Sequence, residues 1–208
     1  KLTFVQKIGV NLEKDIKKDL ILYGGFELKE FSTLGDSSYL KFNPVSNFYD
    51  TIKTIRSSEF IARVRWTKDE EFLSGTFDRT SLRSKYPIIS IQGIFGVKGL
   101  FGSDYNYQKV ELMIEHNRPI GFLGKIRYGA NAGYIFGTAA YPFLKVHEGN
   151  ESLWLLTSTF NKLNFFEFVS DKYVGAFIEN HWEGLLFDRI PLVKKAKLRL
   201  VTTGRITY

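Results

Sequence analysis

Cysteine is absent from this sequence of 208 residues, and methionine occurs only once. The lack of cysteine excludes a disulfide framework and any cysteine-bearing zinc site, and it is common to exported barrels and many cytosolic proteins. No stretch approaches the roughly 18 to 20 apolar residues of a membrane-spanning helix, so only strands could cross a bilayer. The first residues lack the features of a signal peptide and already alternate like a strand. We therefore expect a piece cut from a longer chain.

Aromatic residues and glycines are plentiful instead. The chain has 19 Phe, 11 Tyr, 3 Trp and 18 Gly, a composition that favours strands joined by turns over a helix-rich core. Its formal charge is +7, which is compatible with a nucleic-acid partner, a cationic lumen or loops that face anionic headgroups. Because the cations are scattered and do not interleave with stacking aromatics, we expect no nucleic-acid partner.

Alternation between apolar and polar residues predicts long strands. Within residues 57–67 one parity is apolar and the other carries Arg63 and Arg65, with Ile61 as the exception. Residues 122–136 alternate over a length of roughly 50 Å, at about 3.3 Å for each residue, which suffices for a tilted membrane crossing. The pattern predicts about ten strands, at residues 4–12, 20–31, 57–67, 72–82, 88–98, 107–115, 122–136, 152–160, 173–182 and 196–208.

These strands predict an all-β fold: an antiparallel transmembrane β-barrel that occupies residues 1–208 as one domain. In this fold the apolar parity faces hydrocarbon and the polar parity faces the lumen. A soluble β-sandwich that binds glycans through Trp154 or Trp182 is an alternative, although the apolar face of a sandwich strand rarely extends beyond about six residues. The residues predicted to face the lumen are Arg63, Arg65, Lys109, Glu111, Lys125, Arg127, Lys197 and Arg199.

The connections are predicted to differ in length between the two ends of the barrel. Longer ones, near residues 32–54, 138–151 and 161–171, would be extracellular loops, and the tight ones periplasmic turns. The segment from residue 166 to 173 is a candidate to plug the lumen through its aromatics and Asp171, with partners among the lumen cations. A capping loop on the strand ends is the alternative. The candidate plug or cap residues are Phe166, Phe168, Asp171 and Tyr173.

Several stretches share features with a known family: residues 85–87, 99–105 with Tyr107, 141–144, 147–151, 166–174 (FEFVSDKYV), 179–184 (ENHWEG) and 186–195 (LFDRIPLVKK). They resemble an outer-membrane family of the Bacteroidetes type, which combines an N-terminal carboxypeptidase-regulatory-like domain with a C-terminal barrel of unknown function. The resemblance implies that an N-terminal domain and some flanking strands are missing from this piece.

That family is similar in turn to the BamA and TamA type of surface-antigen barrel, whose members insert or translocate proteins at the outer membrane. Those barrels have more strands, so the resemblance implies that this piece is part of a larger barrel. The inward loop of those barrels carries an Arg-Gly-Phe or Arg-Gly-Tyr tip. Here the chain has Glu151, Ser152 and Leu153 after Gly149-Asn150, with no such tip.

Catalytic and metal-binding patterns are missing from the sequence. His116, His147 and His181 are far apart, and neither a nucleophile elbow nor a phosphate-binding glycine loop occurs. We therefore expect no enzyme, cofactor or metal site. We expect an outer-membrane protein whose partners are the lipid bilayer and other outer-membrane or periplasmic proteins, with a role in their assembly or translocation. A passive pore or receptor is the alternative, with an anion preference from its cationic lumen.

Overall fold

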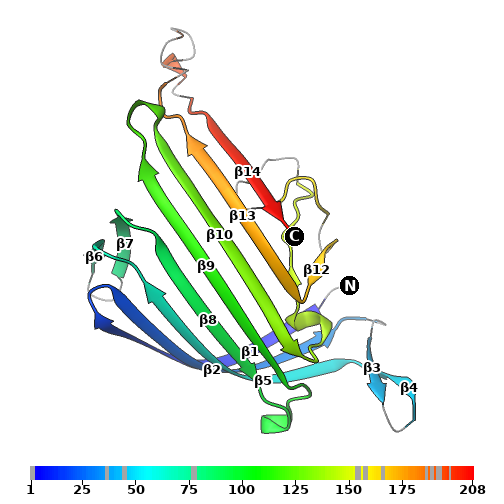
Figure 1. Cartoon of the computed structure of the whole chain (residues 1–208). Helices are drawn as coiled ribbons and strands as arrows, with labels where there is room; N and C mark the ends of the chain where they lie inside the picture. The colour runs from blue at the N-terminus through cyan, green and yellow to red at the C-terminus, as the bar shows by residue number, and fades with distance from the viewer. Residues whose placement is uncertain are drawn as a thin grey trace.

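The computed structural model describes residues 3–35, 38–43, 46–75, 79–152, 156, 159–164, 167–185, 187, 190, 194–196 and 198–208. Eight long antiparallel strands form one sheet, in the order β1-β2-β5-β8-β9-β10-β13-β14 (Figure 1). Each strand pairs with the next long strand along the chain, so the sheet is an up-and-down meander. Its strands are β1 (Thr3–Lys17), β2 (Leu20–Thr33), β5 (Thr54–Trp66), β8 (Ile88–Gly96), β9 (Tyr107–Pro119), β10 (Lys125–Gly137), β13 (Lys172–His181) and β14 (Val201–Thr207).

Short elements occupy the connections between these strands. They include three two-stranded sheets and, within the described residues, the 3₁₀ turns η1, η2 and η3. Among the described residues, no helix is long and apolar enough to cross a membrane. The short strands are β3 (Tyr39–Asn43) with β4 (Phe48–Ile52), β6 (Glu70–Ser74) with β7 (Arg79–Ser84), and β11 (Lys145–Val146) with β12 (Val169–Ser170); the 3₁₀ turns are η1 (Leu100–Gly102), η2 (Gly121–Leu123) and η3 (Tyr141–Phe143).

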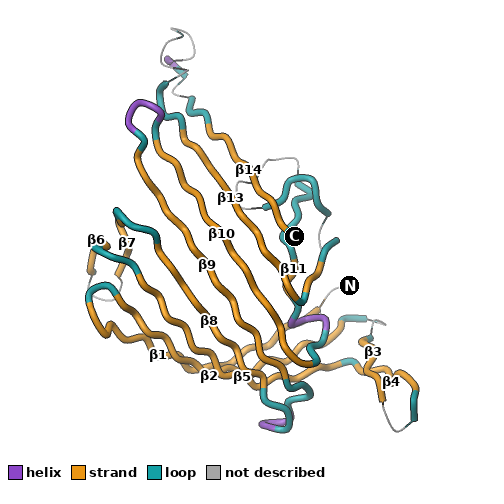
Figure 2. The backbone as a smooth tube through the Cα atoms, in the orientation of Figure 1, coloured by secondary structure: helices purple, strands orange, loops and turns teal. Residues whose placement is uncertain are grey.

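The sheet is rolled rather than flat. In Figure 2, β8 to β14 form a tall wall, while β1, β2 and β5 curve away behind its lower part. Such rolling follows from the right-handed twist of the strands. In the described part of the chain, β1 and β14 are the two edges and no ladder joins them, so the sheet does not close. The observed architecture is an open, rolled antiparallel sheet; the closed barrel stays a prediction.

Eight of the ten predicted strands overlap the eight strands of the sheet. The prediction of one strand over residues 72–82 is wrong, because this segment is divided between β6 and β7, where Phe72 pairs with Ser81. Gly75 lies inside the segment, and a glycine weakens a strand. The predicted strand at residues 152–160 lies mostly outside the described residues, and its last residue, Phe160, forms an isolated parallel bridge with Gly149.

The sixth long strand begins later than the sequence predicts. Residues 121–123 form η2, and β10 starts only at Lys125. Gly124 between them has φ 88°, and a Cβ at this position would overlap the carbonyl oxygen of His181. Only glycine fits at this tight approach, and the positive φ of Gly124 turns the chain out of the strand conformation. The strand β10 therefore does not extend back to Phe122.

The sequence predicts long loops at one end of the sheet and tight turns at the other, but long connections occur at both ends. Residues 34–53 and 138–171 connect strands at one end, where the sequence predicts long loops near 32–54, 138–151 and 161–171, and residues 97–106 form a further connection there that was not predicted. At the other end only the β1–β2 and β9–β10 connections are tight. The β5–β8 connection contains the hairpin of β6 and β7, and the β13–β14 connection spans residues 182–200.

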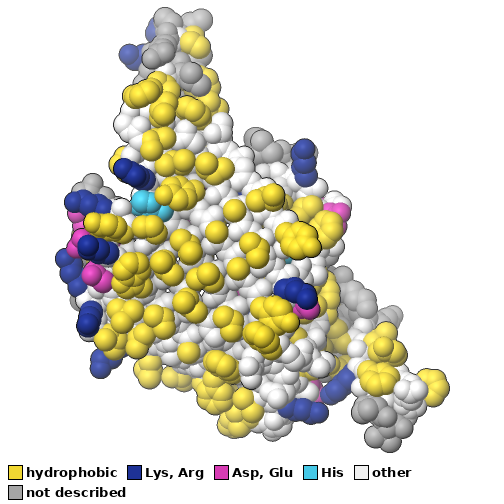
Figure 3. Space-filling view, in the orientation of Figure 1, with side chains coloured by type: hydrophobic (Ala, Val, Ile, Leu, Met, Phe, Trp, Pro, Cys, Tyr) yellow, Lys and Arg dark blue, Asp and Glu magenta, His cyan; other side chains and the backbone are white. Residues whose placement is uncertain are grey.

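The outer face of the sheet is apolar and exposed. In the wall that faces the viewer in Figure 3, hydrophobic side chains are spread over the whole surface, and charged side chains lie toward its margins. The exposed large side chains that alternate along the strands on this face are Ile8, Val10, Leu12, Phe60, Val64, Trp66, Ile91, Phe95, Val110, Tyr128, Tyr134, Phe136, Val174, Ile178 and Ile206. No second sheet covers them among the described residues.

The buried core lies on the opposite, inner face. It contains Ile55, Ile61 and Ile94 from the strands, with Phe143 from the connection between β10 and β13. Ile61 is the apolar residue that breaks the alternation of its strand, and it lies opposite Ile94 in the ladder. The exception in the sequence pattern therefore marks the point where the connection packs against the inner face.

Candidate functional site: the inner face and the segment that covers it

The chain folds back onto the inner face directly after β10. Gly137, with φ 85°, ends this strand, and Pro142 occupies the first turn of η3. We call residues 139–147 the inward segment. Its Phe143 is 7% exposed, stacks on Tyr107 with ring centroids 4.9 Å apart, and contacts Phe31 edge-on at 5.4 Å. The inward segment therefore covers one end of the inner face with an aromatic cluster.

Tyr107 connects this aromatic cluster to a buried carboxylate. Its ring lies over Gly96 of the neighbouring strand, where a Cβ would overlap the ring, so only glycine leaves room. The Tyr107 hydroxyl donates to Glu59 at 2.6 Å. Glu59 is 1% exposed and also accepts from Ser57 at 3.0 Å and from Lys29 at 2.7 Å. All three donors satisfy a charge that would be costly to bury alone.

The row of ion pairs continues across the sheet toward β1. Lys29 contacts Glu27 at 3.2 Å, and Glu27 contacts Lys7 at 2.6 Å. Glu27 is 3% exposed. These side chains come from β1, β2 and β5 and lie on one face, because their positions are opposite one another in the ladders. The inner face is thus lined here by alternating charges in mutual contact rather than by free cations.

A second polar group lies on β9 and its neighbours. Glu111 accepts from Lys109 at 2.9 Å and from the Tyr173 hydroxyl at 2.9 Å. Gln92 donates to Glu111 at 3.4 Å and accepts from Arg63 at 2.7 Å. This group connects β5 to β13 through side chains alone.

A third group of charges lies near the turn between β9 and β10. Arg127 contacts Glu115 at 3.1 Å, and Lys125 contacts Glu183 at 2.9 Å. Together with Asn117, His181 and Arg199, three of these residues (Lys125, Arg127 and Glu183) line a cavity of about 230 Å³. The cavity has a mixed lining of both charge signs and lies at the end of the sheet opposite the inward segment.

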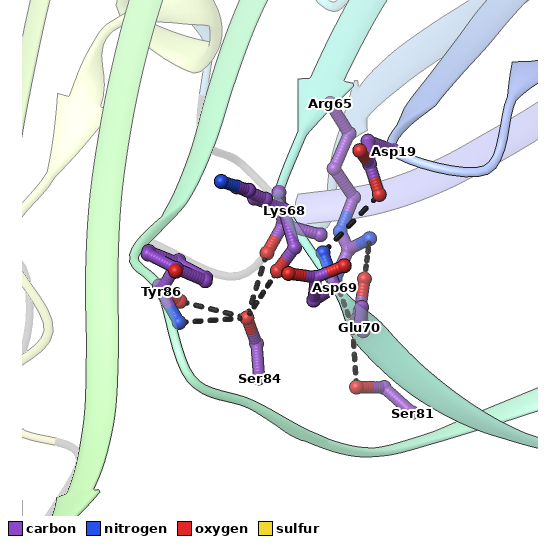
Figure 4. Close-up of polar contacts among 9 residues, drawn as sticks. Asp19, Arg65, Lys68, Asp69, Glu70, Ser81, Ser84 and Tyr86 are labelled. Atoms are coloured by element: carbon purple, nitrogen blue, oxygen red, sulfur yellow. Dashed lines mark hydrogen bonds and ion pairs between the residues drawn. The ribbon is translucent and has the colours of Figure 1, made fainter.

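A fourth group fastens the connection after β5 (Figure 4). Arg65 donates through both terminal nitrogens to the Glu70 carboxylate at 2.6 Å, and the Ser81 hydroxyl donates to the same carboxylate. Glu70 is 3% exposed. The backbone N–H of Asp69 donates to Asp19 in the β1–β2 turn at 3.2 Å. The hairpin of β6 and β7 is therefore tied both to β5 and to the first turn of the sheet.

Most of the residues predicted to face a lumen share the inner face. Arg63 and Arg65 occupy the same parity on β5 as Glu59, and the ladders place Lys109, Glu111, Lys125 and Arg127 on the corresponding positions of β9 and β10. Arg199 lies before β14, outside the ladders, and lines the cavity of the third group. These residues do not form one cluster but belong to the second, third and fourth groups above. Lys197 lies outside the described residues. Because the sheet is open, an enclosed lumen stays a prediction for Arg63, Arg65, Lys109, Glu111, Lys125, Arg127 and Arg199.

In the segment predicted to plug the lumen, one candidate residue is buried on the inner face and two are exposed. Tyr173 is 6% exposed and belongs to the inner-face network, whereas Phe168 is 51% exposed. The Asp171 side chain is exposed, and its backbone carbonyl accepts from the Ile135 N–H at 2.8 Å. Phe166 lies outside the described residues. The cations expected as partners of Asp171 contact other groups instead: Arg63 contacts Gln92, Arg65 contacts Glu70, Lys125 contacts Glu183 and Arg127 contacts Glu115.

The sequence reasoning missed Phe143, Tyr107 and Glu59. The only signal was the Tyr-Pro-Phe stretch at residues 141–143, which lies within the family resemblance but has no alternation. Glu59 follows two serines and precedes Phe60, and nothing in this local pattern indicates that the carboxylate is buried.

The inward segment ends at a buried histidine. The His147 ring is within hydrogen-bond distance of the Ser170 hydroxyl at 3.1 Å and packs edge-on against Tyr173 at 5.9 Å. Burial, with a smaller contribution from the positive charge of Lys145, lowers the pKa of His147. The ring is therefore neutral at neutral pH.

A hairpin of β3 and β4 lies next to the inward segment and is held by an ion pair. Lys41 contacts Asp104 at 2.8 Å, and the Arg56 N–H donates to the same carboxylate at 3.0 Å. Burial acts to raise the pKa of Asp104, but these two donors outweigh it and hold the pKa below its usual value. Among the described residues, no three histidine or acidic side chains lie close enough to hold a metal ion.

These features define the class of protein. The chain is an antiparallel all-β protein with one rolled sheet, an exposed apolar outer face and an inner face of paired charges. It belongs to a family of unknown function, DUF5686, because the model of that family's C-terminal domain matches residues 17–208. No protein with a curated description matches the chain in sequence.

The fold is similar to a solved structure, described as the crystal structure of BamA from Haemophilus ducreyi lacking POTRA domains 1–3. The TM-score is 0.58 at 15% identity, and the match covers 99% of this chain and 41% of that chain. This chain therefore spans about two fifths of its structural neighbour, and the likeness concerns the fold alone. The predicted resemblance is confirmed for the family and for the BamA-like fold. The N-terminal regulatory-like domain and the Bacteroidetes origin stay predictions.

Proposed function

We propose that this chain forms part of the wall of an outer-membrane β-barrel. The observation that carries the proposal is a band on the outer face in which the described residues include no Asp, Glu, Lys or Arg; His116, opposite Tyr128, lies near one margin. Among the described residues, the Asp, Glu, Lys and Arg side chains of this face lie toward the two strand ends: Lys14 and Arg118 at one end, and Glu30, Arg56 and Lys172 at the other. A surface that is apolar in the middle and charged at both margins matches a bilayer core between two headgroup layers.

The height of the band supports the same proposal. On β10 the outward positions from Ile126 to Phe136 are uncharged, a path of about 33 Å at about 3.3 Å for each residue. A strand tilted by about 45° would cover roughly 23 Å along the bilayer normal with this path, close to the apolar band of about 25 Å in known barrels. Tyr128 and Tyr134, toward the two ends of this path, correspond to the aromatic girdles of such barrels.

The soluble sandwich needs a second layer over the apolar face. Among the described residues no second sheet packs there, and the large apolar side chains of that face are exposed. An exposed apolar surface of this extent requires a hydrophobic environment. The membrane therefore explains the outer face better than water does.

We further propose a role in the assembly or translocation of other outer-membrane proteins, with those proteins and the bilayer as partners. The likeness of the fold to BamA supports this role, together with the kinship described above. The passive pore is less well supported, because the inward segment covers one end of the inner face and most of the lumen cations are paired with carboxylates. The pore stays the second candidate.

Two experiments on the full-length protein test these proposals. A barrel should fractionate with the outer membrane and migrate differently on a gel before and after boiling. A protein that stays in the soluble fraction and shows no heat-dependent shift would contradict the barrel. Depletion then separates the roles: loss of an assembly factor should lower the amounts of many other barrels together, whereas loss of a pore should change uptake alone.

A further inference from the structure

The outer face carries a patch of small side chains on two neighbouring strands, β10 and β13. Ala130 on β10 is opposite Ala176 on β13, and Ala132 is opposite Leu112 on β9 and Val174 on β13. Large rings border this patch on the side toward the end of β10, where Tyr134 and Phe136 pack with ring centroids 4.3 Å apart. Ala132 is therefore a small side chain next to two large rings of the same strand.

A cavity of about 660 Å³ lies beside Ala132 of this patch. Its lining is mostly apolar and comes mainly from the outward positions Val110, Leu112, Ala132, Tyr134, Phe136 and Val174, with Gly133, Tyr173 and Tyr208 also contributing. This volume lies in the usual range for sites that bind small molecules. We call it the alanine groove.

One end of the alanine groove carries a positive charge. Lys172 lies opposite Tyr134 in the ladder and also lines the cavity. Its ammonium nitrogen is 5.9 Å from the centre of the Tyr134 ring. Among the described residues no carboxylate forms an ion pair with Lys172, whereas Arg56, at the same margin of the outer face, is paired with Glu30 at 2.8 Å. Lys172, which has no carboxylate partner among the described residues, therefore lies at one end of an apolar groove.

We propose that the alanine groove holds one acyl chain of a phospholipid, whose phosphate contacts Lys172. The inference rests on the proposed membrane location of the outer face. An amphiphile with an apolar tail and an anionic head is complementary to this arrangement, because the groove lies within the uncharged band and Lys172 lies at its margin. Each methylene placed against protein rather than water stabilises such binding, and the ammonium favours the phosphate.

The proposal can be tested by counting bound lipids. The full-length protein is reconstituted into nanodiscs of phosphatidylethanolamine and phosphatidylglycerol, released into mild detergent, and analysed by native mass spectrometry. We expect one retained phospholipid for each protein chain. Ala132→Phe, which fills the groove, and Lys172→Gln, which removes the charge, should each lower the retained fraction about tenfold, the equivalent of roughly 1.4 kcal/mol.

Two matched variants serve as controls. Ala62→Phe adds the same ring on the outward face of β5, and Lys14→Gln removes a lysine at the opposite margin of that face. Both should retain the lipid as the unchanged protein does. Equal retention of the lipid by the unchanged protein and all four variants would contradict the proposed lipid site. Detection of a second copy of the chain or of another polypeptide in place of the lipid would contradict it as well. Failure of the barrel itself would be distinguishable, because the protein would then not enter nanodiscs or show a heat-dependent gel shift.

Discussion

The ring of Phe143 stacks on the ring of Tyr107 with centroids 4.9 Å apart and an interplanar angle of 23°. A residue of the β10–β13 connection thus closes over the first residue of β9, directly above the buried carboxylate of Glu59. This contact joins the inward segment to the charge network of the inner face, and it determines whether that end of the face is covered.

Phe143→Ala should release the inward segment while the sheet remains folded. Removal of a buried phenylalanine side chain costs about 3 to 5 kcal/mol in a core, and here the loss falls on the packing of one connection. We expect faster proteolytic cleavage within residues 139–147 and a larger single-channel conductance in planar bilayers. Phe122→Ala removes the same ring from a position that is 78% exposed and should change neither. Unaltered cleavage in the Phe143 variant would show that the segment is held by other contacts.

Glu70→Gln should destabilise the protein more than the same change at Glu183. Glu70 is buried beneath a two-nitrogen contact from Arg65, so the variant leaves a half-buried guanidinium without its counter-charge. We expect a loss of up to about 3 kcal/mol in the free energy of unfolding, measured by denaturant titration. The Lys125–Glu183 pair is largely exposed, with side chains 60% and 49% accessible, and its loss should be undetectable. Equal effects of the two changes would mean that Arg65 finds another partner.

Much of the sheet follows from alternation alone. Residues 57–67 and 107–115 lie within or largely overlap β5 and β9, because a period of two places one parity on each face of any strand. The same period assigned Arg63 and Lys109 to the face opposite the apolar residues. Local pattern therefore predicts faces well.

Other features depend on contacts between distant residues and have no local pattern. Phe143 is buried because Tyr107 and Phe31 form its pocket, and these residues are 36 and 112 positions away in the sequence. Phe168, in a stretch of aromatics for which the sequence predicts burial in a plug or cap, is 51% exposed. The hairpin of β6 and β7 was not predicted for a related reason: it is held by the contact of Arg65 with Glu70, which produces no alternation in the sequence.

A lysine substitution on the outer face of β9 should destabilise the protein, whereas one on the inner face should be tolerated. Leu112 and Met113 are neighbours in sequence, but Leu112 lies on the outer face and Met113 on the inner face, between Ser90 and Asn131. In a bilayer, Leu112→Lys should cost about 2 to 4 kcal/mol, whereas Met113→Lys should be tolerated beside Glu111 and Glu115. The measurement is unfolding of the liposome-inserted protein in guanidinium, followed by tryptophan fluorescence. Tolerance of both substitutions would place the outer face in water.

The packing of the inward segment should weaken as the pH falls. His147 has a pKa below its usual value of about 6.5, because burial and, to a smaller extent, Lys145 disfavour the charged ring. In the released segment the pKa of His147 returns to its ordinary, higher value. As the pH falls below about 6.5, the His147 ring of the released state therefore binds a proton before the ring of the packed state does. Stability of the packed state is therefore fully present above pH 6.5 and declines as the pH falls toward the lowered pKa.

The backbone N–H of His147 donates to the Phe168 carbonyl at 3.1 Å, so its hydrogen exchange reports on this packing. Exchange, corrected for the intrinsic rate, should be faster at pH 5.5 than at pH 7.5. His147→Gln, which keeps a hydrogen-bonding side chain but does not titrate, should remove the difference. His181→Gln should leave it unchanged, since the His181 side chain is 46% exposed and lies at the far end of the sheet. A pH dependence that survives in the His147 variant would assign the effect to another group.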